Sequence, residues 1–583
     1  MSSIEKFDWR KIENGLRIPA ITYSDQPYVV RTDDGAWLCC ITTGSGAEGA
    51  AGQHVITTRS TDCGKSWSEP VAVEPPDGIE NSYAVMLKAP GGRIFIFYTR
   101  NSDNVRKILT HDRKQTFTRV DCLGHFVFKY SDDHGRSWSA ERYDIPFRLF
   151  RCDRDNVYGG KLCFFWNVGH PFAYGGSAFV SLIKVGEMGD GFYQQSEGCL
   201  LKSPNLFTVS DPADAVWETL PDGDVGLRAP AGGGRVSEEQ NFLALSDGSF
   251  YVTYRTVDGY SVEAYSRDGG HTWSAPRYMQ HPDGRRVKHP RAANFAWRCG
   301  NGNYLYWFHN HGGRFVGEEP RIAYEDRNPV WLLPGVEADS PEGKVIRWGE
   351  PEILLYSDNP MVRMSYPDLV EEDGRYFFTE TEKNLALLHE VPAAFLEKMW
   401  TVAAGKSVVP DVPVLFASGP GPAELPAADL PELFKRNQQA HDFHGERTRA
   451  GFAITGEIAP GASGLLLGNR ASDGRGLALE YTSDRRLVLT LDDGAGESRM
   501  VSEPVPELRK FAVIVDGGPA IVSFVADGKF LDGGDDRQFG WRRFNPELIR
   551  RPNRSPWRVG AGVLHLKFWN DRLQTADAVS LTR

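Results

Sequence analysis

The stretch from Gly232 to Trp273, GGGRVSEEQNFLALSDGSFYVTYRTVDGYSVEAYSRDGGHTW, carries the pattern that decides the fold. It holds two adjacent glutamates, a turn at Asp247-Gly248, and an alternating apolar segment that ends at Arg255. Alternation on both sides of an Asp-Gly turn predicts a pair of antiparallel strands. The last eight residues, Ser266–Trp273, read Ser-x-Asp-x-Gly-x-x-Trp, in which a short acid and a glycine satisfy a tight turn. The stretch therefore predicts one small antiparallel sheet.

The same two patterns recur along the chain. The eight-residue turn returns at Ser60–Trp67 and Ser131–Trp138. Turns followed by an alternating apolar strand begin at Asp34-Gly35, Gly91-Gly92, Gly175-Gly176, Asp247-Gly248, Asn301-Gly302 and Asp373-Gly374. Six such hairpins, with almost no helical periodicity before about residue 385, predict six four-stranded blades around an axis. We therefore interpret residues 1–400 as an all-β, six-bladed β-propeller.

The chain beyond residue 400 is expected to have two parts. Residues 401–440 are rich in Pro, Ala and Gly and lack a sustained period, which indicates a linker. Residues 441–583 alternate again between turns and predict a β-sandwich of jelly-roll or concanavalin-like type. Nothing in this segment indicates catalysis. We expect an accessory domain that supports the propeller, with weak sugar binding as the alternative.

Composition excludes several classes of function. The 583 residues include 41% apolar and 12% aromatic side chains, enough for two domains with large cores. A formal net charge of −11 argues against nucleic acid and against a basic membrane-binding face. No apolar run is long enough to cross a bilayer, and the N-terminal stretch MSSIEKFDWRKIENG shows no apolar core of a signal peptide. We therefore expect a cytoplasmic protein as written, or a secreted or periplasmic one if a leader was removed, and the oligomeric state stays open.

The eight cysteines show no paired zinc spacing, so free thiols in a reducing compartment are expected. We predict neither a metal nor a cofactor.

The eight-residue turn is identified as the Asp box of the sialidase superfamily, whose members are six-bladed propellers. The box itself is a structural turn and predicts fold rather than chemistry. Two other places resemble functional positions of that superfamily. Arg17, in Arg-Ile-Pro, resembles the first member of its arginine triad. Glu239 and Arg255 lie sixteen residues apart around a hairpin glycine, as the activating glutamate and the second arginine do. Glu238 is the competing register, and strand alternation would point it to the opposite face.

Two later positions complete this resemblance. Arg327, after the strand that starts beyond Asn301-Gly302, resembles the third arginine, with a buried structural arginine as the alternative. Tyr366, just before the hairpin at Asp373-Gly374, resembles the nucleophilic tyrosine, with simple packing as the alternative.

The chemistry explains why these groups belong together. A 2-keto acid sugar carries a carboxylate on its anomeric carbon, which repels an attacking carboxylate, whereas a neutral phenol avoids that repulsion. An adjacent glutamate takes the phenolic proton, and arginines grip the substrate carboxylate with planar forks. Sialidases are a known exception to carboxylate nucleophiles among glycosidases. The resemblance thus implies an exo-acting, retaining glycoside hydrolase that removes a terminal acidic sugar, sialic acid or a related ulosonic acid.

The acid/base departs from the family pattern. Sialidases use an Asp in the loop before the first Asp box, but the loop from Thr43 to His54 contains none. Glu48 is the nearest carboxylate, His54 can also carry a proton near neutral pH, and a residue from another loop is the third possibility.

Two histidines bear on the substrate, which is an acidic glycan in the leading hypothesis. His309 and His311 lie on one face of their predicted strand, where substrate contact or a structural role is favoured over metal ligation because a third ligand is not evident. Two alternatives follow. One is a polysaccharide lyase or glycosidase that acts on uronate- or rhamnose-containing glycans through Arg, Tyr and His. The other is a non-catalytic, glycan-binding propeller.

Overall fold

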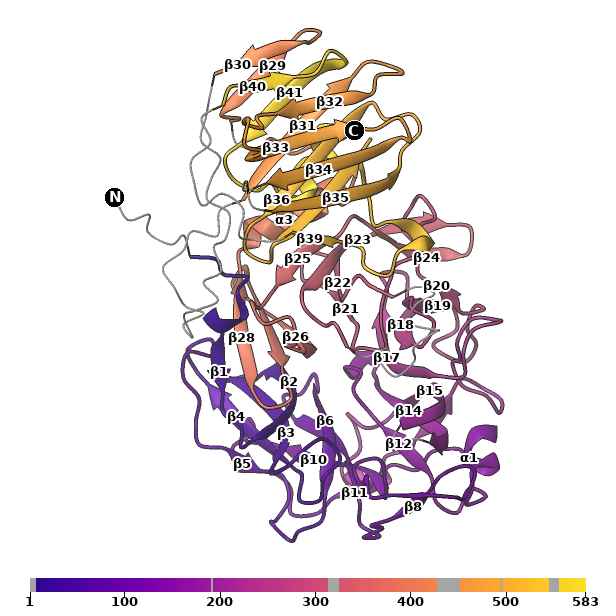
Figure 1. Ribbon diagram of the computed structural model, residues 1–583. Coiled ribbons are helices and arrows are strands. Elements are labelled where there is room, and N and C mark those ends of the chain that lie inside the picture. The colour runs from indigo at the N-terminus through magenta and orange to yellow at the C-terminus, as the bar shows by residue number, and fades with distance from the viewer. Residues whose placement is uncertain are drawn as a thin grey trace.

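The computed structural model describes residues 7–189, 192–312, 325–410, 412–426, 451–492, 494, 496–544 and 555–583. Its N-terminal part is dominated by six antiparallel sheets, in each of which the strands are ordered from an inner to an outer one (Figure 1). The first strands of neighbouring sheets pack against one another, as β2 (Tyr23–Arg31) does against β6 (Asn81–Lys88) and β26 (Ser365–Glu372), so these strands surround a common axis. The expected six-bladed propeller is therefore confirmed.

The first three blades follow chain order. Blade 1 contains β2 (Tyr23–Arg31), β3 (Trp37–Gly44), β4 (His54–Ser60) and β5 (Val71–Ala72). Blade 2 contains β6 (Asn81–Lys88), β7 (Ile94–Arg100), β10 (His125–Ser131) and β11 (Tyr143–Asp144), with a hairpin of β8 (Ile108–Leu109) and β9 (Thr116–Phe117) inserted. Blade 3 contains β12 (Phe164–Trp166), β14 (Ser177–Gly189), β15 (Phe192–Ser203) and β16 (Glu218–Leu220), with β13 (Phe172–Tyr174) on β14 and helix α1 (Arg151–Asp155) before it.

The other three blades complete the ring. Blade 4 contains β17 (Ser237–Ala244), β18 (Phe250–Thr256), β19 (Val262–Ser266) and β20 (Arg277–Tyr278). Blade 5 contains β21 (Phe295–Arg298), β22 (Tyr304–Phe308), β23 (Val330–Ser340) and β24 (Gly343–Trp348), with β25 (Glu352–Leu355) on β23. Blade 6 contains β26 (Ser365–Glu372), β27 (Arg375–Thr381) and β28 (Ala386–Val391), and its outermost strand is the N-terminal β1 (Leu16–Ile18).

Each predicted hairpin turn joins the inner strand of a blade to the second one, or, in blade 3, joins β13 to β14. The three Asp boxes join the third strand to the fourth in blades 1, 2 and 4. In the blade 4 box, Asp268 Oδ1 accepts from Thr272 N at 2.9 Å and from Ser266 Oγ at 2.8 Å. Oδ2 of the same carboxylate accepts from Thr272 Oγ1 at 2.6 Å. The carboxylate of this Asp-box aspartate thus makes its hydrogen bonds within its own turn.

Four inner strands carry the same irregularity, which we call the inner-strand bulge. In β2, β6, β17 and β26 one extra residue stands opposite the second strand of the blade. The residue that bulges has positive φ in each case: Gln26, Tyr83, Glu239 and Tyr366. Bulges re-aim side chains and often stand beside active sites. All four lie where an inner strand begins, which is also where the second strand ends.

The C-terminal part is a sandwich of two sheets (orange and yellow in Figure 1). One sheet contains β29 (Leu415–Ser418), β41 (Val563–Trp569), β31 (Phe452–Ile458), β36 (Lys510–Asp516), β37 (Ile521–Ala526), β38 (Lys529–Phe530) and β39 (Arg542–Arg543). The other contains β30 (Ala423–Leu425), β40 (Trp557–Val559), β32 (Gly464–Gly468), β33 (Gly476–Tyr481), β34 (Arg486–Asp492) and β35 (Glu497–Pro504). Helix α3 (Ala393–Ala403) follows the propeller and α4 (Thr575–Thr582) ends the chain.

The interpretation of residues 401–440 as a linker is partly wrong. Its described residues 412–426 supply β29 and β30, one edge strand for each sandwich sheet, because they pair with β41 and β40 from the end of the chain. Residues 411 and 427–440 lie outside the described residues. None of the helices in the described part of the chain has the length and apolar content to span a bilayer.

Propeller and sandwich share a core. Trp331 and Leu333 of blade 5 belong to the same buried cluster as Ile514 of the sandwich and Val579 of α4. A backbone bridge also joins the end of blade 5 to the sandwich, since Gly312 N donates to Gln538 O and Gly540 N donates to Asn310 O, both at 2.9 Å. The sandwich is therefore packed onto the propeller rather than tethered to it.

Candidate active site

The site is built around a buried tyrosine and glutamate at the axis. Tyr366 OH donates to Glu239 Oε1 at 2.7 Å, and the two side chains come from inner-strand bulges of blades 6 and 4. Burial, followed by the charge of Glu239, raises the pKa of Tyr366 well above its usual value. Burial also raises the pKa of Glu239, although the Arg255 charge opposes it. A carboxylate of raised basicity in contact with a phenol can accept its proton.

Arg255, at the end of β18, binds both adjacent glutamates. Its Nη1 lies 2.9 Å from Glu239 Oε2, and its Nη2 lies 2.9 Å from Glu238 Oε2. Arg291 Nε also donates to Glu238 Oε2, at 3.0 Å. The expectation that Glu238 faces the opposite side of the strand is wrong, because the bulge at Glu239 breaks the alternation of side chains. Glu238 therefore orients Arg255 while Glu239 remains in contact with Tyr366.

Arg327 reaches the same place from the residues that precede β23. Its Nη1 donates to Ser365 Oγ at 2.6 Å, next to Tyr366 in the chain, and its side chain is buried. The next residue in the chain, Asn328, contacts the sandwich, because Arg543 Nη2 donates to Asn328 O at 2.9 Å. The structure thus brings Arg255, Arg327, Glu239 and Tyr366 together.

The predicted place of Arg17 is wrong. Arg17 is exposed on β1, where it stands opposite Leu387 of β28, the third strand of blade 6. The inner strand of that blade is β26, so β28 and β27 lie between the strand of Arg17 and the inner strand. The inner strand of blade 1 is β2, and the residue that precedes its bulge is Asp25. A carboxylate therefore stands in the blade where the first arginine was expected.

Of the two acid/base candidates, Glu48 is the one that contacts the cluster. Its Oε1 lies 3.0 Å from Arg119 Nη2 and its Oε2 lies 3.3 Å from Lys383 Nζ, with 34% of its side chain exposed. Burial works against ionisation, yet the charges of Lys383 and Arg119 lower its pKa to about 2. His54 instead hydrogen-bonds Gly52 O through Nδ1 at 3.2 Å, within its own loop.

Several residues of the site were missed by sequence reasoning. Lys383 follows β27 and binds Asp25 Oδ2 at 2.8 Å, and Tyr23 OH donates to the same oxygen at 2.7 Å. In blade 2, Tyr83 OH donates to Asp121 Oδ2 at 2.6 Å and accepts from Arg119 Nη2 at 2.8 Å. The only signal for Tyr83 and Asp25 was their spacing ahead of a hairpin glycine, and loop residues such as Lys383 had none.

His309 and His311 are buried at the end of blade 5. The His309 ring stacks on His289, with centroids 5.8 Å apart, and the His311 ring packs on Phe539 of the sandwich at 5.3 Å. Burial is the main cause that lowers the pKa of His309 well below its usual value and that of His311 to about 3, so both imidazoles are neutral. These contacts suit a structural role, and substrate contact stays a prediction.

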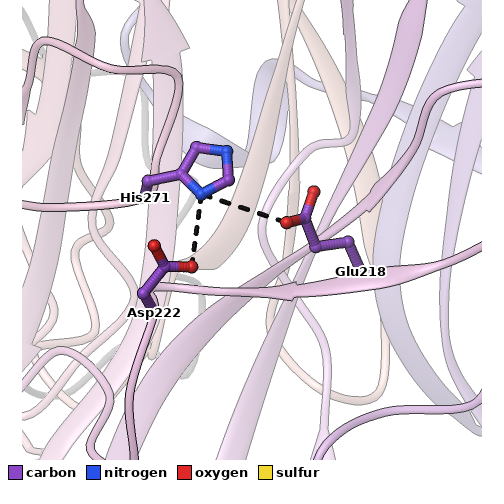
Figure 2. Close-up of side chains that lie close together, drawn as sticks. All are labelled: Glu218, Asp222 and His271. Atoms are coloured by element: carbon purple, nitrogen blue, oxygen red, sulfur yellow. Dashed lines mark hydrogen bonds and ion pairs between the residues drawn. The ribbon is translucent and has the colours of Figure 1, made fainter.

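Within the described residues, one group of side chains has metal-like proximity: Glu218, Asp222 and His271 (Figure 2). His271 Nδ1 lies 3.2 Å from Asp222 Oδ1 and 3.9 Å from Glu218 Oε1. The group joins β16 of blade 3 to the Asp box of blade 4, so it lies at the outer edge of the propeller. Its carboxylates are 42% and 63% exposed, and Glu218 also pairs with Lys202 of the neighbouring strand β15, so these contacts are surface ion pairs.

A family model of known proteins matches about half of this chain. The model of the BNR repeat-like domain matches residues 84–378. No curated protein matches the chain. Among solved structures, Trypanosoma rangeli sialidase with 2,3-difluorosialic acid, a covalent intermediate, is 12% identical over 98% of this chain and 96% of that chain, with a TM-score of 0.42.

Two further solved structures are similar at the same level. A point mutant of NanB sialidase from Streptococcus pneumoniae is 13% identical over 65% of this chain and 70% of that chain, with a TM-score of 0.45. A protein of unknown function from Dyadobacter fermentans is 14% identical over 65% of this chain and 97% of that chain, with a TM-score of 0.42.

Proposed function

Because this chain belongs to the BNR repeat-like domain family, within the sialidase superfamily, we propose that it is an exo-acting, retaining glycoside hydrolase that removes a terminal acidic sugar. The class of sugar is sialic acid or a related ulosonic acid. The observation that carries the proposal is the 2.7 Å hydrogen bond from Tyr366 OH to Glu239 Oε1, beside the guanidinium groups of Arg255 and Arg327.

The first half-reaction uses the buried pair. Tyr366 oxygen attacks the anomeric carbon, its proton passes to Glu239 Oε1, and the bond to the leaving oxygen breaks. Burial makes the phenol hard to ionise in advance, so proton transfer has to accompany attack. Arg255 and Arg327 bind the carboxylate of the sugar and orient it, in a place where water is largely excluded.

The second half-reaction reverses these roles. Water attacks the same anomeric carbon, Glu239 returns the proton to the Tyr366 oxygen, and the sugar leaves with its configuration retained. Glu48 is the acid/base residue: it protonates the leaving oxygen first and then takes a proton from the attacking water. Its position on an exposed loop beside the buried pair suits contact with a leaving group and with solvent.

The proposal is tested by trapping the covalent intermediate. The protein is incubated with 2,3-difluorosialic acid, and intact mass and peptide mapping locate the adduct. We expect one sugar on Tyr366, none on Tyr366→Phe, and normal labelling of Tyr98→Phe. Tyr98 is the matched control, because it is a buried tyrosine that also donates to a glutamate, Glu74, but lies in blade 2 away from Glu239.

Label on another residue, or none on the wild type, refutes the tyrosine mechanism. An unsaturated product absorbing in the ultraviolet, released from a uronate-containing polysaccharide, would instead establish the lyase alternative.

A further inference from the structure

Three blades hold a basic side chain in the same way. In each of them, the residue just before the inner-strand bulge, which we call the anchor, binds a cation. Asp25 lies 2.8 Å from Lys383 Nζ, Glu238 lies 2.9 Å from Arg255 Nη2, and Ser365 Oγ accepts from Arg327 Nη1 at 2.6 Å. These three anchors correspond by register, since they stand opposite Thr42, Arg255 and Thr381 of the second strands. Lys383 and Arg327 come from the same position of the repeat, the loop between the second and third strands of the preceding blade, whereas Arg255 ends the second strand of the blade that holds its anchor.

Lys383 also adjoins the reacting pair. Its Nζ lies 4.2 Å from the centroid of the Tyr366 ring. Its side chain is 23% exposed, whereas its anchor Asp25 is fully buried. A lysine ammonium has three donors, so one bond to Asp25 leaves capacity for other acceptors.

The two carboxylates on Lys383 differ in kind. Asp25 is close, buried and also held by Tyr23, so it is a permanent partner. Glu48 is 3.3 Å away on an exposed loop and is the partner that an incoming anion can replace.

We propose that Lys383 is the third cation that binds the carboxylate of the sugar, beside Arg255 and Arg327, and that Asp25 is the positioning residue that holds it there. The inference rests on the proposed function, because it assigns a residue to the substrate anion of that site. A lysine ammonium is a compact point charge, whereas an arginine guanidinium can bind a carboxylate with two parallel hydrogen bonds. Lys383 would therefore attract the sugar carboxylate by its charge without fixing it in a bidentate geometry.

A consequence for the acid/base residue follows. When the sugar carboxylate binds Lys383, Glu48 loses one of its two ion-pair partners and keeps the other, Arg119. Glu48 then takes up a proton from solvent more readily and can give it to the leaving oxygen.

The test compares binding of an acid with that of its neutral analogue. Isothermal titration calorimetry measures the Kd of free sialic acid and of its C1 carboxamide for wild type, Lys383→Met and Lys383→Arg. We expect Lys383→Met to raise the Kd of the acid by about 10- to 100-fold and that of the amide by less than about threefold, because only the acid carries the charge. Lys383→Arg should keep the preference for the acid.

A second variant guards against misfolding, since Lys383→Met leaves Asp25 buried without its cation. The double variant Asp25→Asn/Lys383→Met removes both charges and should show the same loss for the acid. Lys344→Met is the control, because it breaks a 2.7 Å ion pair with Asp339 on the outer part of blade 5.

The inference is overturned if acid and amide weaken equally, if neither weakens, or if the wild type does not distinguish them. Labelling of Tyr366 is measured separately. If Tyr366 is labelled but the Lys383 variants bind acid and amide as the wild type does, this inference alone is refuted. If Tyr366 is not labelled, the proposed function is refuted.

Discussion

The buried carboxyl group of Glu352 should make the free energy of unfolding depend on pH. It lies on β25 at the junction of propeller and sandwich, is 4% exposed, and its Oε1 accepts from Ala576 N of α4 at 2.9 Å. Burial raises its pKa from the ordinary 4.5 to about 7, although the bond from Ala576 and the charge of Arg572 oppose the shift. The folded protein therefore holds this proton more tightly than the unfolded chain does.

The sign and size of the effect follow from linkage. Its contribution to stability is fully present below about pH 4.5 and is lost as the pH rises through about 7. At about 1.4 kcal/mol per unit of pKa, the whole loss is about 3 kcal/mol, and about 2 kcal/mol of it falls between pH 5.5 and 8. Glu352→Gln keeps an oxygen for Ala576 and cannot ionise, so it should lack this loss.

The assay is urea denaturation at pH 5.5 and 8, followed by circular dichroism. We expect the free energy of unfolding of Glu352→Gln, relative to wild type, to rise by about 2 kcal/mol from the lower pH to the higher. Other titrating groups are shared by the two proteins, so they cancel in the difference. Glu397→Gln, which removes an exposed carboxylate from α3, is the matched control. A relative stability of Glu352→Gln that stays constant within about 0.5 kcal/mol refutes the reasoning.

Two other predictions concern catalysis and the Asp box. Glu239→Gln keeps an acceptor for Tyr366 but cannot take its proton, so kcat on a chromogenic sialoside should fall by about 10²- to 10⁴-fold; an unchanged kcat excludes Glu239 as the base. Gly64→Ala should lower the Tm more than Gly52→Ala, because both glycines have positive φ but an added Cβ at Gly64 would meet Leu388 Cδ2 at 2.2 Å, whereas the space at Gly52 is open. Equal shifts in Tm by calorimetry would contradict this packing argument.

Local sequence was sufficient for the blades because their signals are local. A turn such as Asp247-Gly248 and an alternating strand specify a hairpin without help from distant residues. Residues 412–426 show the opposite case. Their Pro, Ala and Gly content lacks strand character, and β29 and β30 form only because β41 and β40, far along the chain, offer edges to pair with.

The site was predictable where a residue could be counted from a hairpin glycine. Glu239 precedes Gly248 by nine residues, and Tyr366 precedes Gly374 by eight. In blade 1, counting eight or nine residues back from the hairpin glycine Gly35 gives Pro27 or Gln26, which are next to Asp25. Arg17 precedes Gly35 by eighteen residues, twice that distance. The tripeptide Arg17-Ile18-Pro19 matches the family pattern, and no local feature of the sequence indicates that its strand belongs to the last blade. Lys383 lies on a loop whose path depends on tertiary packing, and so it could not be counted.

The closure of blade 6 by β1 has a consequence during synthesis. Leu16–Ile18 leaves the ribosome about 370 residues ahead of its partner Ala386–Leu388, which at about 5–20 residues per second means a wait of roughly 20 to 70 s. Over that time the nascent chain carries an unpaired strand edge, a known invitation to misassembly. A strand of only three residues with a charged, exposed arginine at its centre offers little for another chain to pair with, so β1 presents a protected edge during that interval.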